Sequence, residues 1–298
     1  MPGKSRPSIL LTTIMSDAIP ESTLPYPPVH DNKPFVVLSD WDGTITLQDS
    51  NDYMTDNLGF GKDRRRQGNL DVLAGKQTFR DGFREMLQSI VANGWDFDAC
   101  KDVLRKNIKL DPGFKEFYAW CEAADIPFVI VSSGMAPSIR AVLSNLLGDE
   151  VAERIDIIAN DVEIQPDGKW TIKYRHPSSC LARTAASAMT SRARSCHTKT
   201  SPTRPCCSSL ETGYQASLAP HTIVHRTVLT SADMSAARHA DVLFVKEKLD
   251  GENDLAAYCV REGIPHILFS DFAQALHVVQ AVVSGEKTAQ EVLAIGKA

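Results

Sequence analysis

The segment from Phe35 to Thr46, FVVLSDWDGTIT, constrains the fold more than any other part of the chain. Its first residues, Phe35 to Leu38, are a short apolar run that predicts a strand buried on both faces of a parallel sheet. Asp40 and Asp42 follow at the carboxyl end of that strand. Two such carboxylates repel each other unless a cation or a phosphate group organises them, and Mg²⁺ suits hard oxygen ligands. An Asp-rich turn is the alternative interpretation.

The composition is that of an ordinary soluble globular protein. Of 298 residues, 43% are hydrophobic and 23% are charged, which is enough apolar material for a large core. The net charge of −5 gives no reason to expect a nucleic-acid partner, and no apolar run is long enough to span a membrane. Seven irregularly spaced cysteines predict free thiols in a reducing compartment, the cytoplasm. The proline-rich residues 1–33 predict a disordered lead-in.

Helical periodicity replaces the strand pattern after the first acidic motif. Apolar residues recur at helical spacing from Phe79 to Val91, and glycines separate several such segments. Roughly eighty residues lie between the two strand signals, far more than a simple crossover needs. We therefore predict a helical subdomain over residues 49–121, inserted into a core domain of residues 34–48 and 122–298.

A second strand signal, Ile126 to Val131, ends in Ser132, Ser133 and Gly134. A strand that ends in Ser-Gly is also common loop chemistry, but its pairing with the upstream acidic motif is informative. Further strands are predicted at 155–159, 240–245 and 265–269, a hairpin at 162–174, and helices at 255–262 and 272–295. Alternating strands and helices predict an α/β fold with a parallel sheet.

These motifs resemble those of the haloacid dehalogenase superfamily, in the phosphatase form DxDGT. The helical insert further resembles the cap of its phosphoserine-phosphatase-like subfamily. The resemblance implies a Rossmann-like parallel sheet and Mg²⁺-dependent hydrolysis of a small phosphate monoester. In that chemistry Asp40 is the nucleophile that becomes an aspartyl phosphate, and Asp42 is the general acid and then base. The metal would bind the Asp40 carboxylate and the Asp42 backbone carbonyl.

The same resemblance assigns phosphate binding to the Ser132 hydroxyl and to Ser133 and Gly134. It assigns substrate binding to Asp49 and to Arg84 in the cap. Asp49 as a plain helix cap and Arg84 as a solvated charge are the alternatives. Subfamily members include phosphatases of phosphoserine, of a methionine-salvage intermediate, of phosphocholine and of sugar alcohols, and the sequence does not select among these substrates.

The chain departs from the family pattern between Gly168 and Ala232. The third motif, a lysine that opens a helix, and the fourth, a buried strand that ends in GDGxxD, do not occur there. The pattern returns at Asp233, which stands where the second aspartate of the fourth motif belongs and would bind the metal. With suitably chosen permitted codons, reading residues 186–191 and 207–213 two bases later gives Gly-Phe-Gly-His-Asp-Lys and Leu-Phe-Ser-Gly-Asp-Gly, which match the third and fourth motifs. We therefore interpret residues 179–231 as out-of-frame or intron-derived sequence, which sequencing the transcript tests.

Several expectations follow from this departure. Residues 179–231 should be poorly ordered, the sheet should have a gap, and Mg²⁺ binding and turnover should be impaired. A zinc site built from the cysteines and histidines of this segment is an alternative, but their spacing is irregular. A catalytically silent binding protein on the same scaffold, and a phosphotransferase that uses a small alcohol, are the alternatives from other functional classes.

Overall fold

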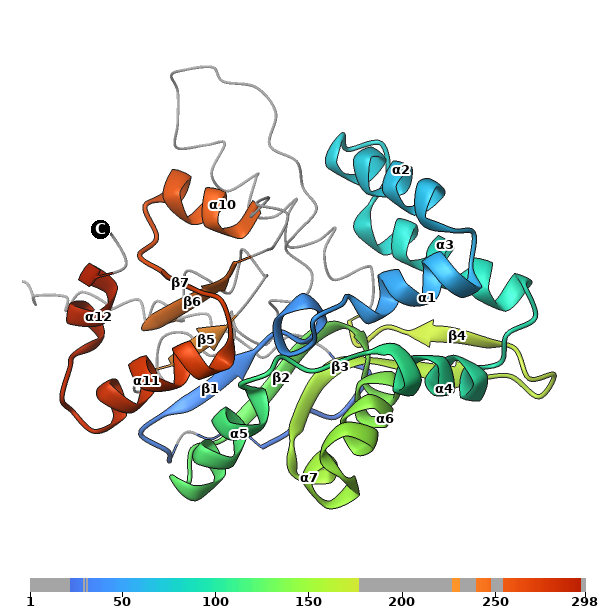
Figure 1. The fold of residues 1–298 in the computed structure, drawn as a ribbon. Helices are drawn as coiled ribbons and strands as arrows, with labels where there is room; N and C mark the ends of the chain where they lie inside the picture. Colours follow the sequence, from blue (N-terminus) through green and yellow to red (C-terminus); the bar gives the residue numbers. More distant parts are fainter. Residues whose placement is uncertain are drawn as a thin grey trace, which may run out of the picture.

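The computed structural model describes residues 22–28, 30, 32–176, 227–230, 240–247 and 254–295. Within them, seven strands form one sheet in the order β4-β3-β2-β1-β5-β6-β7 (Figure 1). All neighbours are parallel except β3 and β4, which form the predicted antiparallel hairpin. The α/β parallel architecture is therefore confirmed. The strands are β1 (Val36–Ser39), β2 (Phe128–Met135), β3 (Asp156–Ile164), β4 (Trp170–Lys173), β5 (Thr227–Thr230), β6 (Val242–Lys246) and β7 (Ile267–Phe269).

Helices cover both faces of the sheet, as its apolar strands require. Alternate residues of β1 point to opposite faces. Val36 and Leu38 pack in a cluster with α10, whereas Val37 belongs to the larger cluster on the other face, with α5, α6 and α11. The core helices are α5 (Phe114–Ala123), α6 (Ala136–Leu147), α7 (Asp149–Arg154), α10 (Asp254–Glu262), α11 (Phe272–Val283) and α12 (Ala289–Ile295).

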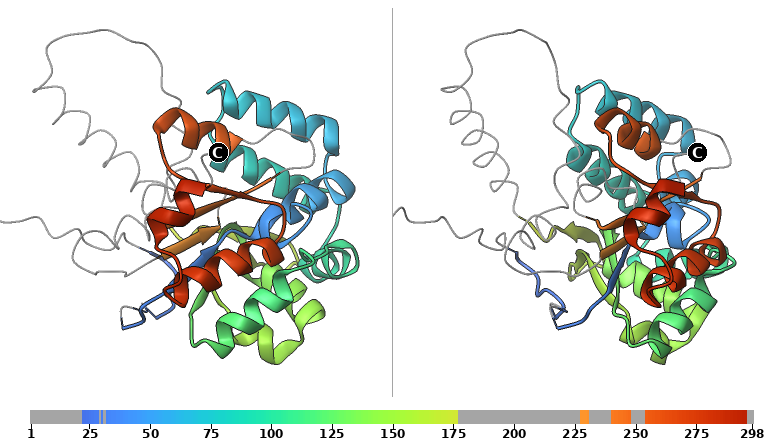
Figure 2. Two further views of the ribbon diagram at one scale, coloured as in Figure 1. Left: turned by 60° about the vertical axis from the view of Figure 1, so that its left-hand side comes forward. Right: turned by 90° about the vertical axis from the view of Figure 1, so that its left-hand side faces the viewer.

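The predicted helical insert follows β1. It contains α1 (Ser50–Leu58), α2 (Lys62–Leu73), α3 (Phe79–Ala92) and α4 (Phe97–Asn107). Both views in Figure 2 place α2 and α3 at the end of the molecule away from α5 to α7. The chain enters and leaves the insert through adjacent segments, since a bridge pairs Thr46 with Leu110. We call α1 to α3 the cap; α4 also packs on α6 of the core.

The predicted boundary of the insert at residue 121 is too late. Helix α5 packs on the core, where Phe114 and Phe117 make edge contacts with Phe128 and Phe272. Gly113 lets α5 approach α11 closely, because a Cβ atom there would lie 2.1 Å from the Ala273 backbone nitrogen. The sequence periodicity of α5 is helical like that of the insert, so it does not reveal which side of the molecule the helix covers.

The sheet has no gap between β1 and β6. Thr227–Thr230 forms β5, which pairs in parallel with both neighbours, so the expectation of a missing central strand is wrong. The rest of the segment from 179 to 226 lies outside the described residues. The single helix expected over 272–295 is two helices, because Gly285 adopts φ 79° and Thr288 starts α12 with a hydrogen-bonded capping box to Glu291.

Part of the lead-in expected to be disordered packs on the core. The Thr23 backbone nitrogen donates to the Arg175 carbonyl at 2.8 Å, just beyond β4. The Arg175 guanidinium donates to the Leu24 and Pro25 carbonyls in return. The prediction of disorder therefore does not hold for residues 22–28. Among the described residues, no helix is long and apolar enough to cross a membrane.

Candidate active site

The acidic motif forms a tight loop at the carboxyl end of β1. Trp41 and Ile45 are fully buried and anchor the loop to the core. Gly43 turns the chain with φ 71°, a conformation that favours glycine, and its nitrogen donates to the Thr46 hydroxyl at 3.1 Å. The Thr44 hydroxyl donates to Asp40 Oδ2 at 3.1 Å. Asp40 therefore stands at the strand tip with its carboxylate oriented by the loop.

The Asp42 carboxyl is buried and held on both oxygens. Its Oδ1 accepts from the Ser50 nitrogen at 2.7 Å and from the Ser50 hydroxyl at 2.6 Å, and its Oδ2 accepts from Asn51 Nδ2 at 2.7 Å. Burial raises the pKa of Asp42 well above its ordinary value, and the negative charges of Asp49 and Asp40 raise it further. Asp42 therefore keeps its proton to a higher pH than an ordinary aspartate, which suits a general acid, although the two hydrogen bonds from Ser50 lower the pKa.

Asp49 is the N-cap of α1. Its side chain accepts from the backbone nitrogens of Asn51 at 2.9 Å and Asp52 at 2.8 Å. Capping was the alternative to the predicted substrate contact, and this geometry is observed. Because Asp49 also raises the pKa of Asp42, it lies close enough to influence the acidic pair electrostatically.

The second motif lies beside the first. The parallel register pairs Ser39 of β1 with Ile130 of β2, so Asp40, just past β1, and Ser132, inside β2, lie toward the same end of the two strands. Ser132 is buried, and its hydroxyl accepts from the Gly134 nitrogen at 3.0 Å. A Cβ atom on Gly134 would lie 3.1 Å from the Asn51 nitrogen that binds Asp42. The structure therefore brings the two predicted motifs together.

Asn160, a residue the sequence did not single out, supports the second motif. At β3, its Nδ2 donates to the Ser133 carbonyl at 2.7 Å, and its Oδ1 accepts from the Arg175 nitrogen at 3.0 Å. It thus links β2 to the segment after β4. An isolated asparagine that follows a predicted strand carries no pattern that would reveal this role.

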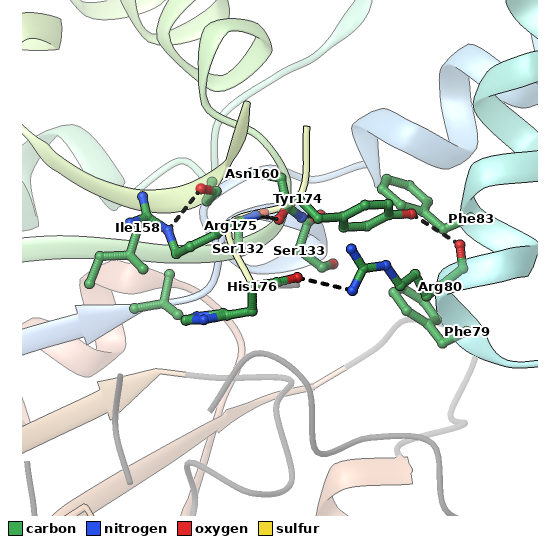
Figure 3. A pocket seen from close by; sticks show the side chains of 12 residues that line it. Phe79, Arg80, Phe83, Ser132, Ser133, Ile158, Asn160, Tyr174, Arg175 and His176 are labelled. Carbon is green, nitrogen blue, oxygen red and sulfur yellow. Dashed lines mark hydrogen bonds between the residues drawn. The ribbon is translucent and has the colours of Figure 1, made fainter. Parts of the chain in front are cut away.

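A pocket lies between the cap and the core (Figure 3). Ser132 and Ser133 line it from the core, next to residues of β3. On the cap side it is lined by residues of α3, with the segment after β4 between the two. The cap and hairpin residues are Phe79, Arg80, Phe83, Tyr174, Arg175 and His176.

The arginine that lines this pocket from the cap is Arg80, whereas the sequence pointed to Arg84; Arg175 lines the pocket from the segment after β4. Arg84 does not line the pocket; its side chain is 41% exposed and pairs with Asp81 at 3.3 Å. The Arg80 guanidinium stacks over the Tyr174 ring at 3.7 Å, and that of Arg84 lies farther away at 5.6 Å. The substrate role of Arg84 remains a prediction, and Asp233 lies outside the described residues.

The loop after β1 has the chemistry of a partial magnesium site. Asp40 and Asp42 are acidic groups close enough for the charge of one to raise the pKa of the other. Oxygen ligands of this kind suit Mg²⁺. Within the described part of the chain, no group of three or more His, Cys, Asp or Glu side chains could hold a metal ion.

Comparison with known proteins agrees with this arrangement. The model of the family described as haloacid dehalogenase-like hydrolase matches residues 37–202. Polyol phosphate phosphatase PYP1 of Saccharomyces cerevisiae is 37% identical over 258 residues, which cover 87% of this chain and 98% of that protein. Pdp3-interacting factor 1 of Schizosaccharomyces pombe is 41% identical over 81% of this chain and 93% of that protein. A HAD family hydrolase from Salmonella enterica serovar Typhi has the same fold, with a TM-score of 0.51 at 16% identity over 82% of this chain and 70% of that chain. The chain therefore belongs to the haloacid dehalogenase-like hydrolase family.

Proposed function

We propose that this chain is a Mg²⁺-dependent phosphatase that hydrolyses small polyol phosphates through an aspartyl phosphate on Asp40. One observation carries the proposal: Asp42, a buried carboxyl whose pKa is raised, lies close to Asp40 at the tip of β1. Catalysis through an aspartyl phosphate needs both a carboxylate nucleophile and a proton donor for the leaving oxygen.

In the proposed mechanism the reaction has two steps, transfer of the phosphoryl group to Asp40 and hydrolysis of the aspartyl phosphate. In the first, the Asp40 carboxylate attacks phosphorus, the bond to the alcohol oxygen breaks, and Asp42 gives its proton to that oxygen. In the second, Asp42 takes a proton from water, whose oxygen attacks phosphorus and releases phosphate and the Asp40 carboxylate. Ser132, with the backbone nitrogens of Ser133 and Gly134, would hold the phosphoryl oxygens. Asp49 would act through its charge on Asp42.

Mg²⁺, when bound, would neutralise the negative charge of the phosphoryl group. The Asp40 carboxylate, the Asp42 backbone carbonyl and Asp233 would hold it. Support for Asp233 comes from β5, which ends at Thr230 and lies parallel to β1. The carboxyl end of β5 is therefore at the same edge of the sheet as Asp40, and Asp233 follows it closely in the sequence.

The substrate class rests on the relatives. The polyol phosphate phosphatase matches this chain over 98% of its own length. Phosphatases of 2-hydroxy-3-keto-5-methylthiopentenyl-1-phosphate match about half the chain or less, at 26–32% identity. The longer match favours a polyol phosphate. The free cysteines Cys100, Cys121 and Cys259 are buried, and we place the protein in the cytoplasm, where thiols stay reduced.

The decisive experiment compares the chain as given with a repaired chain, in which the shifted reading frame is restored across residues 179–231. We expect the repaired chain to release phosphate from glycerol 3-phosphate in the presence of Mg²⁺, and the chain as given to be slower by several orders of magnitude. Asp40→Asn in the repaired chain is the control and should release none. Failure of the repaired chain on a panel of phosphate monoesters would favour a silent binding protein, and equal rates for both chains would refute the impairment.

A further inference from the structure

We propose that Arg80 is the specificity residue of the pocket, and that it binds the hydroxyl oxygens on the alcohol half of a polyol phosphate. This inference rests on the proposed function, because it takes the phosphate end of the substrate to lie at Ser132 and Ser133. Those serines line the core side of the pocket, and Arg80 lines its cap side. A substrate bound by its phosphate therefore extends its alcohol half toward Arg80.

The position of Arg80 is fixed from three directions. Its guanidinium stacks on the Tyr174 ring at 3.7 Å, its Nη1 donates to the His176 carbonyl at 3.0 Å, and the Tyr174 hydroxyl donates to the Arg80 carbonyl at 3.0 Å (Figure 3). All three contacts join α3 of the cap to the segment at the end of β4. A side chain held in this way loses little conformational freedom when it binds a ligand.

The guanidinium also has unused hydrogen-bonding capacity. Its Nε is buried and has no hydrogen-bond partner in the described part of the chain. Its Nη1 donates to an uncharged carbonyl, and no carboxylate of the described residues forms an ion pair with the guanidinium, since Asp81 pairs with Arg84. Burial lowers the pKa of Arg80, and the Tyr174 and Asp81 interactions that raise this pKa do not outweigh the effect of burial. A buried N–H of a charged group without an acceptor is costly, so a ligand oxygen there is favoured.

Two other arginines, Arg65 and Arg175, have structural roles and differ from Arg80 in how their donors are satisfied. Arg65 is buried and fully paired, with Nε and Nη2 on Asp56 at 2.6 and 2.8 Å and Nη1 on Asp52 at 2.6 Å. Arg175 is buried, and backbone carbonyls accept from its guanidinium. Arg80 is only half-buried, but its Nε is buried without a hydrogen-bond partner, and it is the one of the three that lies on the cap side of the pocket.

The neighbours of Arg80 suit the carbon chain of a polyol. Phe79 and Phe83 line the pocket beside it, with stacked rings 5.8 Å apart. Aromatic faces pack against C–H groups while Arg80 takes the oxygens, so the pocket distinguishes an oxygen-bearing alcohol from a bare alkyl chain of the same length. A polyol offers such oxygens without the cost of burying a second anion.

Binding to the full chain carrying Asp40→Asn tests the inference without turnover. Calorimetry would compare glycerol 3-phosphate with n-propyl phosphate, which has the same carbon count and no free hydroxyl. Arg80→Met should weaken binding of glycerol 3-phosphate about tenfold or more, the value of a hydrogen bond to a charged group, and leave n-propyl phosphate within about twofold. Arg64→Met, an exposed cap arginine outside the pocket, is the matched control and should change neither.

Three outcomes would overturn the inference: equal losses for both ligands with Arg80→Met, the loss appearing with Arg84→Met instead, or no binding of glycerol 3-phosphate by the unaltered pocket. Arg80→Lys keeps the charge and removes Nε, so it should show the same selective loss if Arg80→Met does not fold. The two proposals fail separately. If the repaired chain hydrolyses the substrate but Arg80→Met binds both ligands as before, only the role of Arg80 is refuted. If Arg80→Met selectively loses glycerol 3-phosphate but the repaired chain releases no phosphate, only the proposed activity is refuted.

Discussion

At the scale of single residues, the raised pKa of Asp42 suits a general acid but makes the native state less stable as pH rises. Its carboxyl is buried beside Asp49 and Asp40, and both charges raise its pKa, although Ser50 donates to it. Below the pKa of about 4 of an unfolded aspartate, the group is protonated in both the folded and unfolded states. As pH rises, the unfolded state ionises first, so the native state loses stability until the raised pKa is passed.

Asp42→Asn removes this ionisation. In EDTA, which excludes divalent cations, we expect the variant to gain stability relative to the unaltered chain as pH rises from about 4 toward neutrality. The measurement is the free energy of unfolding in urea at several pH values. A difference between the two proteins that stays constant with pH would contradict the raised pKa of Asp42.

The sequence predicted Asp40, Asp42 and Ser132 because each comes directly after an apolar strand signal, and the carboxyl ends of neighbouring parallel strands lie at the same end of a sheet. The sequence alone could not identify Arg80 as the arginine that faces the pocket. It lies one turn from Arg84 on α3, and only the packing of Tyr174, from a hairpin 94 residues away, determines which of the two faces the pocket. The sequence did not reveal the role of Asn160 either, because that role depends on contacts with Ser133 and Arg175 from other segments.

At the scale of elements, a buried ion pair ties the loop after β1 to the core. Asp111 Oδ1 accepts from the Phe272 nitrogen at 2.9 Å at the start of α11, and its Oδ2 accepts from the Lys246 ammonium at the end of β6. Lys246 also donates to the Thr44 carbonyl at 3.4 Å, in the acidic loop. The side chains of Asp111 and Lys246 are 1% and 13% exposed, so the pair is largely withdrawn from water.

Lys246→Met leaves the Asp111 carboxylate buried without its cation, and we expect it to lower the free energy of unfolding by about 3 kcal/mol. The same change in an Asp111→Asn background should cost less, because no charge is left uncompensated. Lys76→Met, which breaks an exposed pair with Asp71, is the control and should cost less than about 1 kcal/mol. Urea denaturation measures all four; equal losses for Lys246 and Lys76 would contradict a buried, coupled pair.

Strand β5 is an element that hydrophobic periodicity in the sequence does not predict. Thr227–Thr230 is four residues long, and it follows a stretch without apolar periodicity. So short a segment gives no alternating pattern of its own. Its place is determined by β1 and β6, each of which offers a free edge of backbone donors and acceptors that only a parallel strand between them satisfies. Tertiary pairing, not local sequence, creates this element.

At the scale of the whole molecule, the site is assembled from segments far apart in the chain. Asp40 and Ser132 come from adjacent strands, and Arg80 comes from the cap. In the proposed function, Asp233 joins them from the segment after β5, the strand on the other side of β1. Because the proposed metal ligands come from two strands, a bound cation would link both halves of the sheet and stabilise the native state as a whole.

This linkage gives a test that does not depend on turnover. Millimolar Mg²⁺ should raise the free energy of unfolding of the repaired chain by about 1–3 kcal/mol, as expected when a ligand is present well above its dissociation constant. The chain as given, which lacks the first aspartate of the fourth motif, should gain much less, and Asp40→Asn should abolish the gain in the repaired chain. Thermal unfolding with and without Mg²⁺ measures this, and Ca²⁺-free buffers with EDTA provide the baseline. Equal stabilisation of both chains would mean that restoring the reading frame across residues 179–231 adds nothing to Mg²⁺ binding. The prediction that the chain as given binds Mg²⁺ weakly would then be wrong.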